Sequence, residues 1–306
     1  MFEEFGYNQF LIKRYLKLFG KDETKKLLES NERIPLKAIR INTLKTKVEN
    51  CISRLEEKGF SFKKIKWCDY CFEVIEEPFS VGSTTEYLLG FFYIQDATSV
   101  LPSMVLNPSE KDLVLDMAAA PGGKTTHLSQ IMNNKGVIIA IDINKEKIKA
   151  LKSNIHRMGC ENTILLRTDA LKIDQLSFDK ILIDAPCTAE GTIRKNPELK
   201  KRLKLEDFEK YANKQKQFID VAYKLLKPKG IIVYSTCAIS PEENEEVVEY
   251  ALSKGMKLLD TGIKEGLPGL TFFFGKEHNK ELVKCKRFYP HIHDTQGFFI
   301  AKLVKL

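Results

Sequence analysis

The chain has 306 residues, of which 43% are apolar and 29% charged, and its net charge is +8. This length can bury the core of two ordinary domains, and no run approaches the roughly 18 apolar residues that a membrane helix needs. Acids at Glu3 and Glu4 are unlike a secretory signal, so the sequence argues against secretion and membrane insertion, and we expect a cytoplasmic protein.

The first hundred residues predict a small domain of mixed structure. Helical periodicity covers residues 10–28 and 48–58, and extended segments are expected at residues 38–44, 61–66 and 71–75. We therefore predict a small N-terminal α/β domain over residues 1–82. Residues 83–106 lead into the main domain, which spans residues 83–306.

The main domain alternates short β-branched runs with longer helical stretches. The expected strands are residues 113–116, 137–142, 164–167, 180–184, 231–235 and 298–303, and the expected helices are residues 124–132, 145–158, 205–226 and 241–253. This alternation predicts a Rossmann-like α/β domain, a parallel sheet with helices on both faces. Ligands of such sheets bind beyond the carboxyl ends of the strands, where the strand order reverses.

A loop of small residues follows the first of these strands. It reads Ala118, Ala119, Ala120, Pro121, Gly122 and Gly123, and Lys124 follows it at the start of a helix. Small residues let the backbone approach a ligand, and a helix N-terminus offers free N–H groups to an anion. One interpretation is the phosphate loop of a nucleoside triphosphatase, because Gly123-Lys124-Thr125 matches the end of that motif, although Ala118 stands where its first glycine is required.

The other interpretation is an adenosyl cofactor with an amino-acid tail, S-adenosylmethionine. Acids follow four successive strands at Asp116, Asp142, Asp169 and Asp184. Asp142 is placed to accept the ribose hydroxyls, Asp169 to accept from the adenine amino group, and Asp184 to face the reacting centre. Each acid taken alone is equally typical of a helix cap or a turn, but four of them at one sheet edge favour cofactor binding.

Two of the seven cysteines are expected at the same edge. Asp184-Ala-Pro-Cys187 ends the fourth strand and Tyr234-Ser-Thr-Cys237 ends the fifth. Lone cysteines are usually small buried hydrophobes, but a thiolate beside a methyl donor has a chemical use. Addition of a thiolate to carbon 6 of cytosine activates carbon 5 toward a methyl sulfonium, and Lys124 is a candidate for the positive charge that favours the thiolate. Asp184 is a candidate for holding the base.

These motifs look like those of the Nol/Nop/Sun family of RNA cytosine-5 methyltransferases, in particular the archaeal tRNA-modifying type without an added RNA-binding domain. The resemblance covers nearly the whole chain. It rests on residues 116–125, 184–194 and 234–245, and continues in residues 40–45, 90–96 and 290–299.

The resemblance implies roles for individual residues. Cys237 is implied as the nucleophile and Cys187 as the thiol that assists product release, an order that the chemistry alone leaves open. The family's cofactor loop corresponds to residues 118–124, its ribose acid to Asp142, its adenine-side acid to Asp169 and its acid near the methyl group to Asp184. Family members often have Arg where this chain has Lys147.

The expected partner is RNA. Residues 194–229 hold 12 basic and 5 acidic side chains, and a focused positive stretch attracts polyanions, although a solvated helix face is the alternative. We expect a monomer that methylates tRNA, with ribosomal RNA second. RNA contact is assigned to the N-terminal domain and to Arg194, Lys195, Lys200, Lys201 and Lys204. The alternatives from other classes are a P-loop-like nucleoside triphosphatase and a non-catalytic RNA-binding protein.

The remaining cysteines are expected to be reduced thiols, because an odd number spread thinly over a long chain is not a disulfide framework. Cys68-Asp-Tyr-Cys71 has the spacing of a zinc-ligand pair, but a structural zinc site needs four ligands and a second pair does not follow nearby. We therefore expect no metal.

Overall fold

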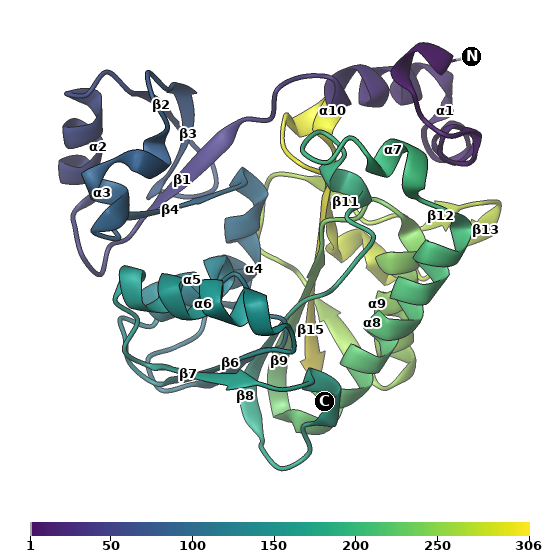
Figure 1. The fold of residues 1–306 in the computed structure, drawn as a ribbon. Coiled ribbons are helices and arrows are strands. Elements are labelled where there is room, and N and C mark those ends of the chain that lie inside the picture. Colours follow the sequence, from purple (N-terminus) through teal and green to yellow (C-terminus); the bar gives the residue numbers. More distant parts are fainter. Residues whose placement is uncertain (1) are drawn as a thin grey trace. The chain divides into compact units, whose positions relative to one another are not determined.

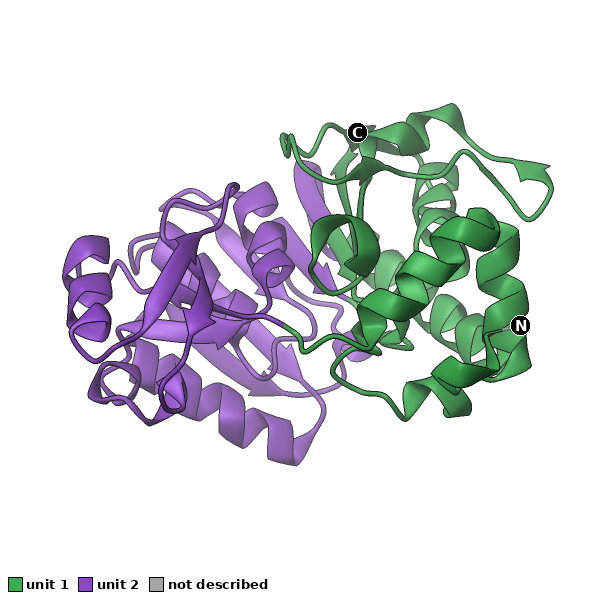
Figure 2. Cartoon of the chain, turned by 90° about the horizontal axis from the view of Figure 1, so that it is seen from above, with its two compact units in different colours: residues 1–35, 185–223, 234–306 green, residues 36–184, 224–233 purple. Residues whose placement is uncertain are grey.

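The fold is described for residues 2–306 of a computed structural model (Figure 1). Contacts divide the chain into two compact units (Figure 2): unit 1 comprises residues 1–35, 185–223 and 234–306, and unit 2 comprises residues 36–184 and 224–233. Within the described residues, every helix is too short or too polar to span a bilayer.

Unit 2 begins with a four-stranded antiparallel sheet in the order β2-β3-β1-β4. Its strands are β1 (Lys37–Ile41), β2 (Ser61–Lys64), β3 (Cys71–Glu76) and β4 (Phe92–Gln95), and its helices are α2 (Val48–Glu56) and α3 (Thr85–Leu88). Ile39, Phe60 and Phe92 are buried in one apolar cluster with Cys51 and Leu55 of α2. The sequence predicted α2, β2 and β3 in this region, whereas α3 and β4 lie in the segment that was expected only to lead into the main domain.

The rest of unit 2 is a parallel sheet. Its strands follow the order β9-β8-β5-β6-β7, and the register of β5 with β6 and β8, and of β6 with β7, is parallel. They are β5 (Leu113–Asp116), β6 (Val137–Asp142), β7 (Thr163–Arg167), β8 (Phe178–Asp184) and the first part of β9 (Leu226–Thr236). The chain runs outward from β5 to β7 and then returns to β8 on the other side of β5. The strand order therefore reverses beside β5, and the small-residue loop follows this strand.

Three helices of unit 2 pack side by side along this sheet. α4 (Leu101–Leu106) contacts α5 (Gly123–Ile131), and α5 contacts α6 (Lys145–Met158) (Figure 1). Asn144 caps α6 by accepting hydrogen bonds from the N–H groups of Glu146 and Lys147, and Gly159 ends the helix with a positive φ of 71°. These two signals explain why the bounds of α6 match the expected helix.

Unit 1 combines helices with short antiparallel strands. Its helices are α1 (Gln9–Asn31), α7 (Leu199–Arg202), α8 (Leu205–Leu225), α9 (Glu245–Ser253) and α10 (Pro290–His293), and its strands are the end of β9, β10 (Met256–Leu259), β11 (Leu267–Pro268), β12 (Phe272–Phe273), β13 (Lys276–Glu277), β14 (Lys286–Phe288) and β15 (Phe298–Lys305). Leu11, Tyr15 and Leu27 of α1 are buried in one cluster with Leu203 and Phe208. The N-terminal helix is thus a core element of unit 1.

The C-terminal strands correct one expectation. β15 pairs antiparallel with β10 and with β14, and β14 pairs antiparallel with β11, so the prediction of a wholly parallel sheet is wrong here. The physical reason is that a parallel pair requires a long crossover, usually a helix. After α9 the chain turns back through short segments, and antiparallel pairing is what such connections allow.

The boundary between the two units differs from the predicted domain boundary. α1 belongs to unit 1 and β1 to β4 belong to unit 2, whereas the sequence grouped them in residues 1–82. The division at residue 82 stays a prediction.

Candidate active site

The register of the parallel strands places two acids on either side of the small-residue loop. Asp116, the last residue of β5, is paired with Ala140 of β6 and with Leu182 of β8. Both neighbouring strands therefore run two residues beyond Asp116 and end at Asp142 and Asp184. The loop that leaves β5 begins between these two carboxylates.

Backbone hydrogen bonds fix the loop between the neighbouring strands. Met117 N donates to Leu182 O at 3.1 Å, and Ala119 N donates to Ile141 O at 2.9 Å. Gly122 has φ 108°, and a Cβ there would lie 2.9 Å from Cδ1 of Leu151, so this close approach requires glycine. The predicted loop is thus a rigid, backbone-lined surface.

Arg40 holds the start of helix α5 from the four-stranded sheet. Its fully buried guanidinium donates to Gly123 O at 3.0 Å and to Thr126 Oγ1 at 2.8 Å. Burial lowers the pKa of Arg40 to about 10. Arg40 lies in one of the motifs that resemble the family, but its role could not be predicted, because nothing in the sequence shows that β1 lies against α5.

Lys124, the second residue of α5, forms an ion pair with Asp184 at the end of β8. The distance from Lys124 Nζ to Asp184 Oδ2 is 2.6 Å, and both side chains are partly buried. The structure thus brings together two of the predicted catalytic residues, and the pair presents a donor and an acceptor at the sheet edge.

Asp142 and Asp169 are half-buried and partly committed to local turns. Asp142 accepts from Ala120 N at 3.3 Å and from Asn144 N at 2.9 Å, so it links the loop to the start of α6. Asp169 accepts from Leu171 N at 3.0 Å and caps the short helix η4 (Ala170–Lys172). Both carboxylates therefore accept hydrogen bonds from local turns and also lie at the predicted sheet edge. Lys147 is exposed on α6.

Asp116 differs from the other strand-end acids because it is fully buried. Its Oδ2 accepts from Thr125 Oγ1 at 2.7 Å, and its Oδ1 has no hydrogen-bond partner among the described residues. Burial raises the pKa of Asp116 to about 7. This acid therefore links the end of β5 to α5 through a buried hydrogen bond.

The two predicted thiols meet in unit 1. Sγ of Cys187 lies 3.2 Å from Sγ of Cys237, and both cysteines are free. The hydrogen bond with Cys237, together with burial, raises the pKa of Cys187 well above its usual value. Cys187 therefore holds its proton at neutral pH.

Gly191 and Gly297 let the two cysteine loops approach. Gly191 N donates to the carbonyl of Cys237 at 2.9 Å, and Gly297 N donates to Gly191 O at 2.8 Å. A Cβ on Gly191 would lie 2.6 Å from Cys237 O and 2.6 Å from Gly297 O. Real Cβ atoms do not approach so closely, so the contact requires glycine at this position.

Glu243 and Gln215 clamp the loop that carries Cys187. Glu243, in η6 (Pro241–Glu243), accepts from the backbone N–H of Thr188 at 2.9 Å and from its hydroxyl, and Gln215 donates to both Glu243 and the carbonyl of Pro186 at 3.0 Å. Burial raises the pKa of Glu243 to about 7. This clamp was not predicted; its one signal in the sequence is that Glu243 lies within residues 234–245, which resemble a family motif.

Comparison with known proteins decides the family. Residues 103–304 match the family model described as 16S rRNA methyltransferase RsmB/F, and residues 8–97 match the N-terminal domain of 16S rRNA methyltransferase RsmF. The chain belongs to the RsmB/F family. The predicted membership among Nol/Nop/Sun RNA cytosine-5 methyltransferase domains, which depend on S-adenosylmethionine, is therefore confirmed.

Individual RsmB/F relatives carry different substrate names. The chain is 39% identical to the 25S rRNA (cytosine-C(5))-methyltransferase nop2 of Schizosaccharomyces pombe over 99% of this chain and 51% of that protein. It is 45% identical to the tRNA (cytosine(72)-C(5))-methyltransferase of Pyrococcus horikoshii over 76% of this chain and 58% of that protein. The chain thus spans about half the length of these curated relatives.

Two solved structures confirm the Rossmann-like fold of the RsmB/F chain. A methyltransferase homolog from Pyrococcus horikoshii is 41% identical, with a TM-score of 0.91 over 99% of this chain and 97% of that one. NSun6 from Pyrococcus horikoshii, solved with SFG, an analogue of S-adenosylmethionine, is 31% identical, with a TM-score of 0.88 over 97% and 98% of the two chains.

The basic stretch of this RsmB/F chain is less exposed than the sequence suggested. Arg194 is buried, donates to Arg33 O and pairs with Asp294 at 2.7 Å, and Lys200 is buried and pairs with Glu32. For these two residues the expected surface position is wrong, because each cation is neutralised by a partner distant in sequence. Lys195, Lys201 and Lys204 are exposed.

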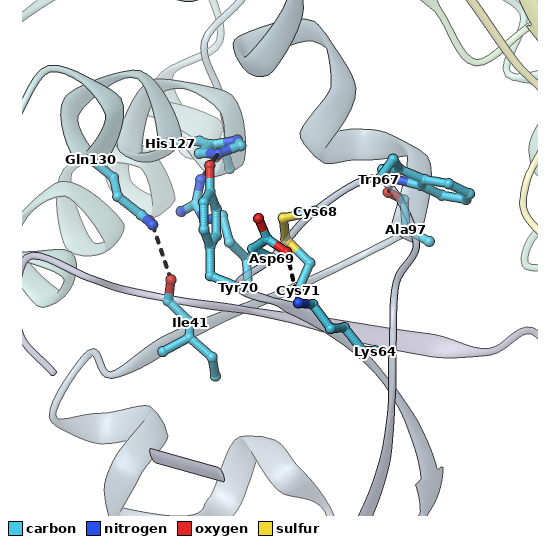
Figure 3. Close-up of a disulfide and its surroundings, with 12 residues drawn as sticks. Ile41, Lys64, Trp67, Cys68, Asp69, Tyr70, Cys71, Ala97, His127 and Gln130 are labelled. Carbon is cyan, nitrogen blue, oxygen red and sulfur yellow. Dashed lines mark hydrogen bonds and ion pairs between the residues drawn. A yellow bond between two sulfur atoms is a disulfide. The ribbon is translucent and has the colours of Figure 1, made fainter. Parts of the chain in front are cut away.

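Cys68 and Cys71 correct the expectation of reduced thiols. The structure joins them in a disulfide that links the turn before β3 to Cys71, the first residue of that strand (Figure 3). Tyr70, between them, contacts His127 Nε2 through its hydroxyl at 2.9 Å. The two cysteines whose spacing resembled a zinc-ligand pair therefore form a local cross-link beside α5.

Proposed function

We propose that this chain transfers a methyl group from S-adenosylmethionine to carbon 5 of cytosine in RNA, with tRNA as the preferred substrate. The observation that carries the proposal is the contact between the free thiols of Cys187 and Cys237, 3.2 Å apart. Carbon 5 methylation needs a thiol nucleophile, and a nucleoside triphosphatase has no use for a thiol pair.

The cofactor is assigned to the loop after β5 and the acids around it. Ala118, Ala119, Ala120, Pro121, Gly122 and Gly123 give a surface with few side-chain atoms, which suits the methionine part, and Asp142 suits the ribose hydroxyls. The half-buried carboxylate of Asp169 suits the adenine amino group, and Lys147 extends the site along α6. The cofactor, when bound, supplies an electrophilic methyl group on a sulfonium.

The chemistry is divided between the two thiols. The thiolate of Cys237 adds to carbon 6 of cytosine, and the electron pair that this releases makes carbon 5 nucleophilic toward the methyl group. With the cofactor bound, carbon 5 would take the methyl group, and the electron pair of the broken carbon–sulfur bond would stay on the sulfur of the cofactor. A base then removes the proton from carbon 5, the bond from carbon 6 to sulfur breaks, and the thiolate of Cys237 returns. Cys187 is assigned to product release on the family resemblance, and the 3.2 Å contact of its Sγ with Sγ of Cys237 supports the pairing of the two thiols.

Lys124 and Asp184 form the polar side of the proposed site. Asp184, three residues before Cys187 in the chain, accepts from the exocyclic amine of the cytosine, or from its ring nitrogen when that nitrogen is protonated, and Lys124 holds Asp184 in place through the 2.6 Å ion pair. The carboxylate then orients the base for attack at carbon 6.

RNA is captured by exposed cations and by the N-terminal domain over residues 1–82. Lys195, Lys201 and Lys204 are assigned to phosphates, and Arg194 and Lys200 to the support of the segment that carries them. The target cytosine leaves its stack to reach the thiols, as bases do when enzymes modify them. The protein acts as a cytoplasmic monomer.

The experiment is bisulfite mapping of total tRNA and ribosomal RNA after incubation with the protein and S-adenosylmethionine. A methylated position in a tRNA supports the proposal. A methylated position in ribosomal RNA instead makes ribosomal RNA the substrate, the alternative that the rRNA-named relatives favour. Isothermal titration with S-adenosylhomocysteine and ATP tests the class. Tight binding of ATP alone, or RNA binding without any methylation, would contradict the proposed function.

A further inference from the structure

Unit 1 contains a pocket of about 510 Å³ beside Cys187, a size typical of small-molecule sites. Its lining includes one aromatic ring, Tyr211, two cations, Arg202 and Lys204, and one carboxylate, Asp207. We propose that this pocket binds the nucleotide next to the target cytosine in the RNA chain. The inference rests on the proposed function and names a substrate subsite for it.

The wall of the pocket is fixed before any ligand arrives. Leu203 is buried in the core of unit 1, so the flanking Arg202 and Lys204 are held at the surface. The side chain of Asn8 donates to the carbonyl of Leu203 at 2.8 Å, and Lys204 N donates to Asp207 Oδ2 at 2.9 Å. A preformed wall lowers the entropy cost of binding.

The lining matches the three chemical parts of a ribonucleotide. Arg202 and Lys204 are exposed cations that suit a phosphate. The half-buried ring of Tyr211 suits the face of a base, since every base has a face that stacks. One oxygen of Asp207 is used by the start of α8, which leaves the other to accept an N–H group from the edge of the base.

The pocket is assigned to a neighbouring nucleotide rather than to the target base. Cys187 lies in its lining, whereas Cys237, the proposed nucleophile, is not among the described lining residues. The target carbon must contact Cys237. An RNA chain that places cytosine there extends past Cys187, and the nucleotide adjoining the target then reaches Tyr211.

The first test is a double-mutant cycle between protein and RNA. The substrate is an oligonucleotide spanning the cytosine that the wild type methylates, with single abasic substitutions at the two nucleotides on each side. At one of these positions, loss of the stacked base should lower the wild-type kcat/KM about tenfold. For Tyr211→Ala, kcat/KM with the RNA abasic at that position should equal kcat/KM with the intact RNA. Tyr211→Phe keeps the ring and should therefore keep the abasic penalty of the wild type. An unchanged abasic penalty in Tyr211→Ala would overturn the assignment.

The second test measures binding without catalysis. Arg202→Ala with Lys204→Ala is compared with Lys210→Ala and Lys214→Ala, which remove the same charge from exposed positions of α8 outside the pocket lining. With a fluorescein-labelled RNA oligonucleotide and no cofactor, the pocket pair should weaken binding more and give the shallower salt dependence. Equal losses would overturn the assignment. If the difference holds but the wild type methylates no RNA, the pocket's RNA binding stands and the proposed activity fails.

Discussion

Glu243 accepts hydrogen bonds from both the backbone N–H and the hydroxyl of Thr188, the residue that follows Cys187. The same carboxylate accepts from Gln215, which also holds the carbonyl of Pro186. The thiol of Cys187 is therefore positioned through its neighbours on both sides. The contact of Cys187 with Cys237 therefore depends on the buried side chain of Glu243, which lies on a different loop.

Replacement of Glu243 by Gln tests this clamp. The amide has one accepting oxygen where the carboxylate has two, so a donor from Thr188 or Gln215 loses its partner. We expect the free energy of unfolding to fall by about 1 to 3 kcal/mol and kcat to fall, with the affinity for S-adenosylhomocysteine unchanged. Urea unfolding, methylation kinetics and calorimetry measure the three. Glu246→Gln, on α9, is the matched control and should change the unfolding free energy and kcat little. An equal loss in this control would show that the effect is not specific to Glu243.

Replacement of Gly191 by Ala should separate the cysteine loops. The new Cβ meets the carbonyl oxygens of Cys237 and Gly297 at 2.6 Å, and backbone must move to relieve the clash. We expect a stability loss of about 1 to 3 kcal/mol and at least a tenfold loss of methylation. Gly82→Ala, where the nearest side-chain atom is 3.3 Å away, is the control. Full activity in Gly191→Ala would show that the approach of the loops is not needed.

The buried acid Asp116 predicts a pH dependence of stability. Its pKa is raised from 3.8 to about 7 by burial, so between these values the native state binds more protons than the unfolded state. Its contribution to stability therefore falls as pH rises through this window. Asp116→Asn removes that contribution, and its stability relative to the wild type should rise by about 3 kcal/mol between pH 4.5 and pH 7.5. Urea unfolding at both pH values measures the difference; a constant gap would contradict the raised pKa.

The disulfide between Cys68 and Cys71 predicts a thiol count. Five of the seven cysteines are free, so thiol titration of protein denatured without reductant should find five reactive groups, and prior reduction should raise the count to seven. Cys51, Cys160 and Cys285 account for the free thiols outside the candidate site. Seven groups before reduction would show that this pair is reduced.

Much of the site could be predicted because its residues end regular elements. Strand-end acids and the small-residue loop follow from hydrophobic periodicity, and parallel strands place their ends at one edge. Cys187 and Cys237 were expected at that edge for the same reason, and in the structure their sulfur atoms lie 3.2 Å apart. Local sequence patterns were therefore enough to predict the site residues whose position is set by the register of the strands.

The unpredicted features depend on partners distant in the sequence. Arg194 and Lys200 belong to a basic stretch, and only the fold shows that Asp294 and Glu32 neutralise them. The clamp at Glu243 and the approach of Gly191 to Gly297 likewise join loops that no periodicity connects. β10 to β14 were missed because their segments are too short to show a period, whereas β15 was predicted as a strand but not its antiparallel pairing.

The central claim is that Cys237 attacks the cytosine and Cys187 assists its release. Incubation of each alanine variant with substrate RNA and S-adenosylmethionine, followed by a denaturing gel, tests it most directly. Cys187→Ala should accumulate a covalent protein–RNA adduct, because release is impaired after attack, and Cys237→Ala should form no adduct and transfer no methyl group. An adduct with Cys237→Ala and none with Cys187→Ala would reverse the two roles and contradict the account.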